Sequence, residues 1–172
     1  MKPVCLVLGA GAGIGGTVAT KFAQEGYHSS LCRRTDKEGL DRLVKNIEGQ
    51  GGSANGYIMN AIEDNAIEEV ITSIETDIGP IEVLVYNLGA QTGMKLLEQT
   101  SHKEFEWGWR MASFGLFRVA KVLCPLMVER GKGTFLVTSA TAAMRGNRNQ
   151  HSHAAAMGAR RMLCQSLNAE FS

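Results

Sequence analysis

The sequence has few cysteines, no excess of charge of one sign and no long apolar run, and each shortage narrows the choice of function. Its four cysteines lie far apart within apolar stretches and form no C-x-x-C pair: Cys5, Cys32, Cys124 and Cys164. This spacing is unlike a disulfide framework or a cysteine-based metal site and is typical of small buried side chains in a reduced compartment. We therefore predict a cytoplasmic protein without a metal site.

Charge and hydropathy exclude two further classes of partner. The 18 basic and 17 acidic residues are interspersed and leave a formal net charge of +1, so no field favours nucleic acid or an anionic membrane. No apolar stretch is expected to reach the ~20 residues of a membrane span, and the N-terminus has no signal-peptide layout. Partners must therefore be inferred from local sites.

The chain is long enough for one well-buried domain. It has 172 residues, of which 44% are hydrophobic and 20% charged, which is ordinary globular composition. No linker, charge block or low-complexity segment divides it. We therefore predict a single domain over residues 1–172.

Short apolar runs alternate with longer stretches of helical periodicity. Five runs have β propensity: PVCLVL, HSSLC, SANGYIM, IEVLVY and GTFLVTS. Helices are predicted over 13–25, 36–49, 63–77, 101–129 and 151–170. This alternation indicates an α/β fold, a Rossmann-type doubly wound parallel sheet in three layers (αβα) with the strand order 3-2-1-4-5.

The run VLGAGAGIGG places Gly9, Gly13 and Gly15 directly after the first strand. Glycines there permit a tight turn and let backbone N–H groups approach a pyrophosphate, which a helix N-terminus also attracts. The simpler alternative is a strand-to-helix turn that binds no ligand. Because the glycines lie within a βαβ unit, a dinucleotide site is favoured.

Several motifs in order make the chain resemble the short-chain dehydrogenase/reductase family over nearly its whole length. The family's T-G-x-x-x-G-I-G matches residues 9–15, with Leu8 where threonine is usual, and N-N-A-G appears at 86–89 as Y-N-L-G. The aspartate after the third strand corresponds to Asn60, and ARRMLCQSLNAEF resembles the later turns of the active-site helix. The resemblance implies an NAD(P)-binding oxidoreductase fold.

The resemblance also implies a set of cofactor-binding positions. They are Gly9, Gly13, Ile14, Gly15, Arg33, Arg34, Asn60, Asn87 and Gly89. Arg33 stands where an acidic side chain would receive the ribose of NAD, and a guanidinium fits a 2′-phosphate, so NADP(H) is favoured over NAD(H). Alternatively, Arg33 and Arg34 are solvated loop charges.

The family's catalytic groups are not at their expected places. Asparagine, serine, tyrosine and lysine of the family fall at Ala112, Ala140, His153 and Met157. Ser139 precedes Ala140 and is expected to point the other way, and Arg161 is predicted to be the nearest cation on the helix face. The resemblance thus implies an NADP(H)-binding protein with a degenerate catalytic site.

Two alternatives stay open. One is a divergent NADP(H)-dependent oxidoreductase for a carbonyl or alcohol substrate, with His153 as acid/base, since imidazole exchanges protons near neutral pH. The simpler interpretation of His153 is a partly exposed histidine in the first turn of a helix. The other alternative is a non-catalytic subunit that stabilises a paralogue.

Family members continue through further strand and helix units that shape the substrate pocket. We expect this sequence to lack those units and to be part of a longer chain, or an oligomer to cover the edge of its sheet. A homodimer or homotetramer is predicted through helices 101–129 and 151–170. Its faces are residues at helical spacing, Trp107, Met111, Phe114 and Leu123 on one helix and Ala155, Ala159 and Met162 on the other.

Overall fold

The computed structural model describes residues 2–89 and 93–172 and divides into two compact units. Unit 1 comprises Met1–Asn87 and Val122–Val137, and unit 2 comprises Leu88–Lys121 and Thr138–Ser172. Unit 1 holds the whole sheet, and unit 2 is built mainly of helices.

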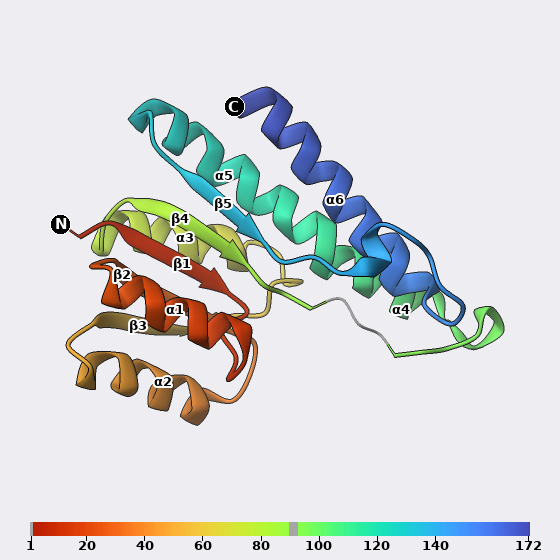
Figure 1. Ribbon diagram of the computed structural model, residues 1–172, viewed down its shortest axis with the longest axis horizontal. Helices are drawn as coiled ribbons and strands as arrows, with labels where there is room; N and C mark the ends of the chain where they lie inside the picture. The colour runs from red at the N-terminus through yellow and green to blue at the C-terminus, as the bar shows by residue number, and fades with distance from the viewer. Residues whose placement is uncertain (1, 90–92) are drawn as a thin grey trace. The chain divides into compact units, whose positions relative to one another are not determined.

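The sheet of unit 1 has five parallel strands. They are β1 (Val4–Leu8), β2 (His28–Arg33), β3 (Ser53–Ile58), β4 (Ile81–Tyr86) and β5 (Thr134–Val137). Their order is β3-β2-β1-β4-β5 (Figure 1). Every residue of β1 is buried, as a central strand covered on both faces requires. The predicted fold and strand order are confirmed.

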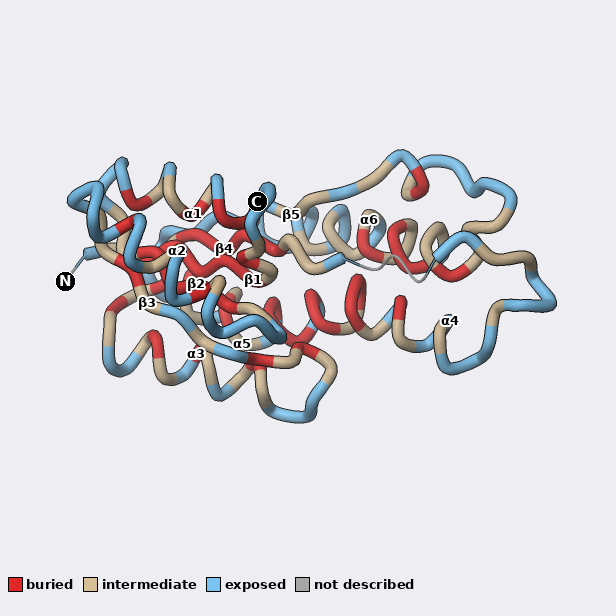
Figure 2. Tube along the Cα trace, turned by 90° about the horizontal axis from the view of Figure 1, so that it is seen from below, coloured by how far each residue is buried: buried red, intermediate tan, exposed pale blue. Residues whose placement is uncertain are grey.

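Helices cover both faces of this sheet. They are α1 (Ile14–Gln24), α2 (Lys37–Gly49) and α3 (Ala66–Asp77). Ala19 of α1 and Leu40 of α2 share one apolar core with Val7 of β1, whereas α3 buries its own row of isoleucines. Figure 2 shows α1 and α3 on opposite sides of the buried strands. The result is the predicted αβα layering.

The last turns of α5 (Gly115–Arg130) belong to unit 1 and are tied to α3 and β4. The Arg130 guanidinium donates to both carboxylate oxygens of Glu75, at 2.7 and 3.1 Å, and to the Ile81 carbonyl at 3.1 Å. Glu75 in turn accepts from the Ile81 amide at 2.9 Å. Charge-assisted bonds of this kind are short and directional, so they hold the last turn of α5 in place against α3 and β4.

Two cysteines match the expectation of small buried side chains and two match it in part. Cys5 and Cys32 are buried in β1 and β2, while Cys124 and Cys164 are half-buried, and none of these four is joined in a disulfide. Burial raises the pKa of Cys5 to about 12 and also raises that of Cys32. Such thiols stay protonated and unreactive at neutral pH.

The helix predicted over 101–129 is interrupted, which corrects the expectation of one regular helix. It consists of α4 (His102–Trp109), a π-helical turn (Arg110–Phe114) and α5. A π-turn closes i→i+5 bonds and so holds an extra residue. The predicted oligomer face crosses this turn and is wrong in part, because Met111 and Leu123 are buried within the chain.

Unit 2 is completed by α6 (His151–Phe171) and two short 3₁₀ turns, η1 (Leu97–Gln99) and η3 (Thr141–Ala143). The helix α6 packs against α4, the π-turn and η3. Its first turns therefore bring residues of three chain segments together.

One helical stretch is more apolar than the sequence suggested. His102–Arg130 is long and apolar enough, by length and composition, to cross a membrane, and 61% of its most apolar stretch is buried. The expectation that no stretch reaches this length is thereby corrected. A single such helix is weak evidence for a membrane span, because buried core helices have the same character.

Candidate functional site

The turn between β1 and α1 has a conformation that requires glycine. Gly9 has φ 93°, in the left-handed region where side chains are strained. The amides of Gly9 and Ala10 both donate to the carbonyl of Cys32, at 3.0 and 2.9 Å. The turn is thus fixed to the carboxyl end of the neighbouring strand β2.

The start of α1 lies directly against this turn. A Cβ on Gly15 would lie 2.2 Å from the Gly9 carbonyl oxygen, and one on Gly16 would lie 2.5 Å from that of Gly11. At Gly13 nothing lies within 4 Å of an added Cβ, and Ile14 is 63% exposed. First-turn amides have no acceptor within their own helix, so this open helix start is able to bind an anionic phosphate.

Asn87 links the first and fourth strands at this edge. Its backbone amide donates to the Leu8 carbonyl at 2.8 Å, and its side-chain amide donates to the Gly9 carbonyl at 3.0 Å. The predicted role of Asn87 in holding the turn after strand four agrees with this geometry.

The two arginines after strand two differ in their surroundings. Arg33 is half-buried and forms an ion pair with Asp36, Nη2 to Oδ2 at 2.9 Å. Arg34 is exposed, and within residues 2–89 and 93–172 it has no ion-pair partner. The sequence placed Arg33 at the position that receives the ribose but did not predict its ion pair, because the partner of Arg33 is set by the turn that follows the strand.

Asn60 serves the turn after β3. Its side-chain amide donates to Glu63 at 3.0 Å, and its side-chain oxygen accepts weakly from the Ile62 amide at 3.5 Å. Its predicted contact with an adenine amine stays a prediction. Gly89, also predicted to contact cofactor, is exposed, and an added Cβ would have open space around it.

Three of the four family catalytic positions meet in one apolar cluster of unit 2. Ala112 and Met157 are buried together with Ala156, and Ala140 packs against them. Ser139 is exposed while Ala140 is partly buried, as predicted from their alternation. The cluster brings together side chains that have no proton, charge or hydrogen bond to offer a substrate.

His153 is the exception among these positions. It lies in the first turn of α6 and is half-buried, in agreement with the simpler interpretation of a first-turn histidine. Its Nδ1 is buried and accepts or donates no hydrogen bond within the described chain.

Sequence reasoning missed a buried cation near this cluster. Arg160 is only 2% exposed and donates to three backbone carbonyls, those of Ala112 at 2.9 Å, Thr138 at 3.0 Å and Leu88 at 2.6 Å. The prediction that Arg161 is the nearest cation on this face is therefore wrong. The available signal was spacing, because Arg160 follows the apolar Met157 by three residues and so shares its helix face.

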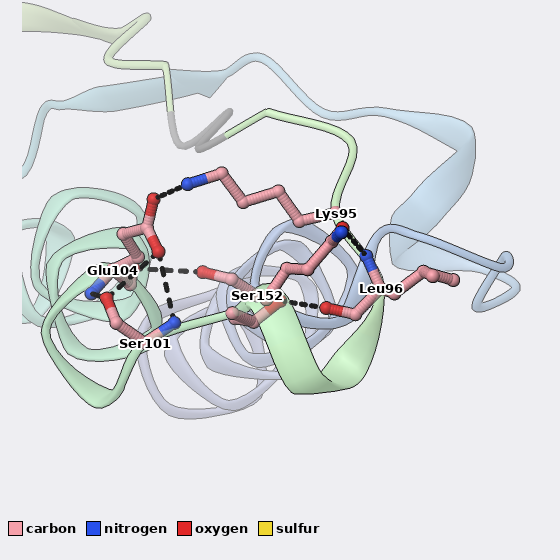
Figure 3. A network of polar contacts seen from close by, with 7 residues as sticks. Lys95, Leu96, Ser101, Glu104 and Ser152 are labelled. Atoms are coloured by element: carbon pink, nitrogen blue, oxygen red, sulfur yellow. Dashed lines mark hydrogen bonds and ion pairs between the residues drawn. The ribbon is translucent and has the colours of Figure 1, made fainter.

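A polar network fixes the first turn of α6 to α4 (Figure 3). Ser101 and Glu104 form a capping box, Lys95 forms an ion pair with Glu104, and Ser152 Oγ donates to the Glu104 carbonyl at 3.1 Å. The bond from Lys95, followed by those from Ser101, lowers the pKa of Glu104 to about 2. The network holds the turn that carries His153.

In residues 2–89 and 93–172 no three His, Cys, Asp or Glu side chains come together as a metal site. The His-x-His pair at the start of α6 therefore has no completing ligand among the described residues.

The parallel sheet, the obligatory glycines after β1 and the open helix start define a Rossmann-type protein with a dinucleotide-binding fold. Comparison with known sequences gives the family. The profile of the short chain dehydrogenase family matches residues 3–172, and the chain belongs to that family.

Individual relatives agree with this assignment. The 3-oxoacyl-(acyl-carrier-protein) reductase of Thermotoga maritima is 33% identical over 152 residues, which are 88% of this chain and 61% of the reductase. The structure of an NAD⁺-bound xylitol dehydrogenase superposes with a TM-score of 0.91 at 25% identity, covering 98% of this chain and 65% of that one. An actinorhodin polyketide ketoreductase with NADPH gives 0.91 at 26%, covering 99% and 65%. This chain thus spans about three fifths of the reductase.

Proposed function

We propose that the protein binds NADP(H) and lacks the hydride-transfer chemistry of its family. The apolar cluster of Ala112, Ala140 and Met157 is the observation that carries the second part. A tyrosine acid/base needs a neighbouring cation to lower its pKa of ~10. Histidine stands at the tyrosine position and a buried methionine at the lysine position, so neither member of that pair is present.

The preference for NADP(H) rests on Arg34 and Arg33 at the end of β2. The exposed Arg34 guanidinium is available to a 2′-phosphate, and a phosphate is matched by the planar fork of arginine. Related structures hold both cofactors, NAD⁺ in the xylitol dehydrogenase and NADPH in the ketoreductase. The cofactor preference proposed for this chain therefore depends on its own two arginines.

Fluorescence titration with NADPH and NADH tests cofactor binding. We expect tighter binding of NADPH, and Arg34→Met is expected to reduce NADPH affinity about tenfold while leaving NADH nearly unchanged. Equal affinities of the parent for the two cofactors would contradict the proposed preference.

A turnover assay tests the absence of catalysis. The Thermotoga maritima relative is named as a 3-oxoacyl-(acyl-carrier-protein) reductase, so a 3-oxoacyl thioester is an appropriate carbonyl probe. With NADPH and a 3-oxoacyl thioester we expect no oxidation of NADPH above background, although NADPH binds. Turnover comparable with ordinary enzymes, at ~1 s⁻¹ or faster, would contradict the proposal.

A divergent oxidoreductase is the second candidate, and the half-buried His153 at the family's tyrosine position favours it. An imidazole exchanges protons near neutral pH and is able to act as the acid/base. In that case the parent turns over, His153→Ala abolishes turnover, and binding of NADPH is retained. If His153→Ala changes nothing in a protein that binds NADPH, this candidate is excluded.

Self-association through unit 2 is also proposed. Trp109 and Phe117 are both more than 40% exposed, and each stacks on Phe114, at 5.2 and 6.4 Å between ring centroids. A row of exposed aromatic rings favours a protein partner, either a second copy or a paralogue. Light scattering of the parent and of Trp109→Lys distinguishes an assembly through this face from a monomer.

A further inference from the structure

The carboxylate of Asp36 interacts with two groups at once. Its Oδ2 lies 2.9 Å from Nη2 of Arg33, and its Oδ1 accepts from the Gly39 amide at 2.9 Å, which caps the start of α2. Asp36 adopts a left-handed backbone conformation, with φ 60°. One acidic side chain therefore holds both the arginine and the helix start.

The close approach at Gly39 shows how tightly this arrangement is built. A Cβ on Gly39 would lie 2.3 Å from Asp36 Oδ2 and 2.5 Å from Arg33 Nη1. The ion pair thus rests directly on the first turn of α2. A guanidinium alone is unfavourable at the positive end of a helix, so the Asp36 charge is what stabilises Arg33 there.

A 2′-phosphate bound at the end of β2 needs the same guanidinium. An arginine binds phosphate best with two parallel N–H donors, and Asp36 already engages one side of Arg33. A phosphate near Arg33 also meets the negative charge of Asp36, which acts against binding. The formal charge of Arg33, Arg34 and Asp36 together is +1, whereas two arginines alone give +2.

We propose that Asp36 is a specificity-determining residue that competes with the 2′-phosphate for Arg33 and so narrows the preference for NADP(H) over NAD(H). The inference rests on the cofactor site proposed above. NADH has a ribose hydroxyl at this position and does not need the guanidinium, so Asp36 weakens NADPH binding selectively.

The test is Asp36→Asn. Asparagine retains a side-chain oxygen to cap Gly39 and tolerates positive φ, so α2 keeps its start while the charge is lost. We expect NADPH affinity to rise about three- to tenfold, with NADH affinity changed less than about twofold. The affinity for adenosine 2′,5′-bisphosphate is expected to rise as that for NADPH does, whereas the affinity for AMP is expected to stay unchanged. The gain shrinks as ionic strength rises.

Two further variants provide controls. Glu38→Gln removes an equally negative, more exposed charge from the same helix turn, but Glu38 faces Arg42 and not Arg33. We expect it to change the NADPH to NADH ratio much less than Asp36→Asn does. In a chain that carries Arg33→Met, the substitution Asp36→Asn is expected to give a smaller gain, because only the charge repulsion is then removed and no guanidinium is left to compete for.

The outcomes separate this inference from the proposed function. If the parent binds neither NADPH nor adenosine 2′,5′-bisphosphate, both are overturned. If the parent binds NADPH more tightly than NADH but Asp36→Asn leaves the ratio unchanged, or lowers it, or matches Glu38→Gln, only the role of Asp36 is overturned. The role of Asp36 is established if the ratio of NADPH to NADH affinity rises more in Asp36→Asn than in Glu38→Gln, and rises more with Arg33 present than in Arg33→Met.

Discussion

The Nε of Arg160 donates a hydrogen bond of 2.9 Å to the carbonyl oxygen of Ala112, which lies inside the π-helical turn. A side chain that donates into a helical ladder is a recognised cause of its interruption. The same guanidinium holds the carbonyls of Thr138 and Leu88. Arg160 thus fixes three chain segments of unit 2 from within α6.

Replacing Arg160 is therefore expected to destabilise the protein. Arg160→Leu leaves buried carbonyls without donors and is predicted to lower the free energy of unfolding by about 3 kcal/mol. Arg160→Lys is predicted to lose less, because an ammonium still donates but lacks the planar fork. Urea denaturation measures both, with Arg161→Leu as the neighbouring control, expected within about 0.5 kcal/mol of the parent. Equal losses at 160 and 161 would contradict this role.

Gly15 and Gly13 form a matched pair for the glycine turn. Gly15→Ala brings a methyl group into the Gly9 carbonyl, which also holds Asn87, and is predicted to cost about 2 kcal/mol of stability. Gly13→Ala meets open space and is predicted to cost about 1 kcal/mol or less.

Cofactor affinity, unlike stability, is expected to be sensitive to the substitution at Gly13. A methyl group at Gly13 occupies the open space through which a pyrophosphate approaches α1, so NADPH affinity is expected to fall about tenfold in a protein that is still folded. Thermal unfolding and cofactor titration of both variants check this. Unchanged NADPH affinity in Gly13→Ala would place the pyrophosphate elsewhere.

The network around Glu104 predicts a stability that depends on pH. The bonds from Lys95 and Ser101 lower the pKa of Glu104 from 4.5 to about 2. A carboxyl group with a lowered pKa in the folded state contributes stability above its unfolded pKa and loses it as the pH falls through the folded value. The contribution is therefore full above about pH 5 and declines toward pH 2.

Glu104→Gln is the variant that isolates this effect. The stability difference between the parent and Glu104→Gln is expected to be constant from about pH 5 to pH 7 and to shrink as the pH falls from 4.5 toward 2. Urea denaturation across this range measures it, with Glu106→Gln, a more exposed carboxyl group, as the control. A stability difference between the parent and Glu104→Gln that grew on acidification would contradict the lowered pKa of Glu104.

Substitutions at Met157 test directly whether the cluster of Ala112, Ala140 and Met157 requires apolar side chains. Met157→Leu is expected to cost less than about 1.5 kcal/mol, while Met157→Lys places an ammonium among alanines and is expected to cost about 3 kcal/mol. Burial lowers the pKa of such a lysine, so the destabilisation is expected to be smaller at about pH 10 than at pH 7. Thermal unfolding at the two pH values checks both the size and the direction.

Much of the fold was predictable from the sequence, because its signals are local. The turn at Gly9, the buried run Val4–Leu8 and the alternation of strands with helices follow from patterns within a few residues, and the structure confirms the strand order derived with the family resemblance. The π-turn was not predictable in this way. An extra residue shifts the following helix face by about 100°, so helical spacing counted across it joins faces that are separate.

The environments of individual side chains were the second feature that could not be predicted from the sequence. Nothing in the run RRTD indicates that Asp36 turns back onto Arg33, because the ion pair depends on the left-handed backbone of Asp36 and on the lack of a side chain at Gly39. Likewise, an arginine is rarely fully buried, so its residue type argues against the interior position that Arg160 has. Both cases depend on backbone partners that are distant in sequence or special in conformation.

The packing of Ala112, Ala140 and Met157 against one another also constrains how this sequence is able to change over generations. A single step toward a lysine or an asparagine in the cluster introduces a buried polar group before any partner exists to bond it. Such intermediates lose stability without gaining chemistry, and only several simultaneous changes escape that loss. Point mutation one residue at a time is therefore a poor route from this chain to a polar family-type site, whereas recombination with a relative that already carries the whole segment avoids the unstable steps.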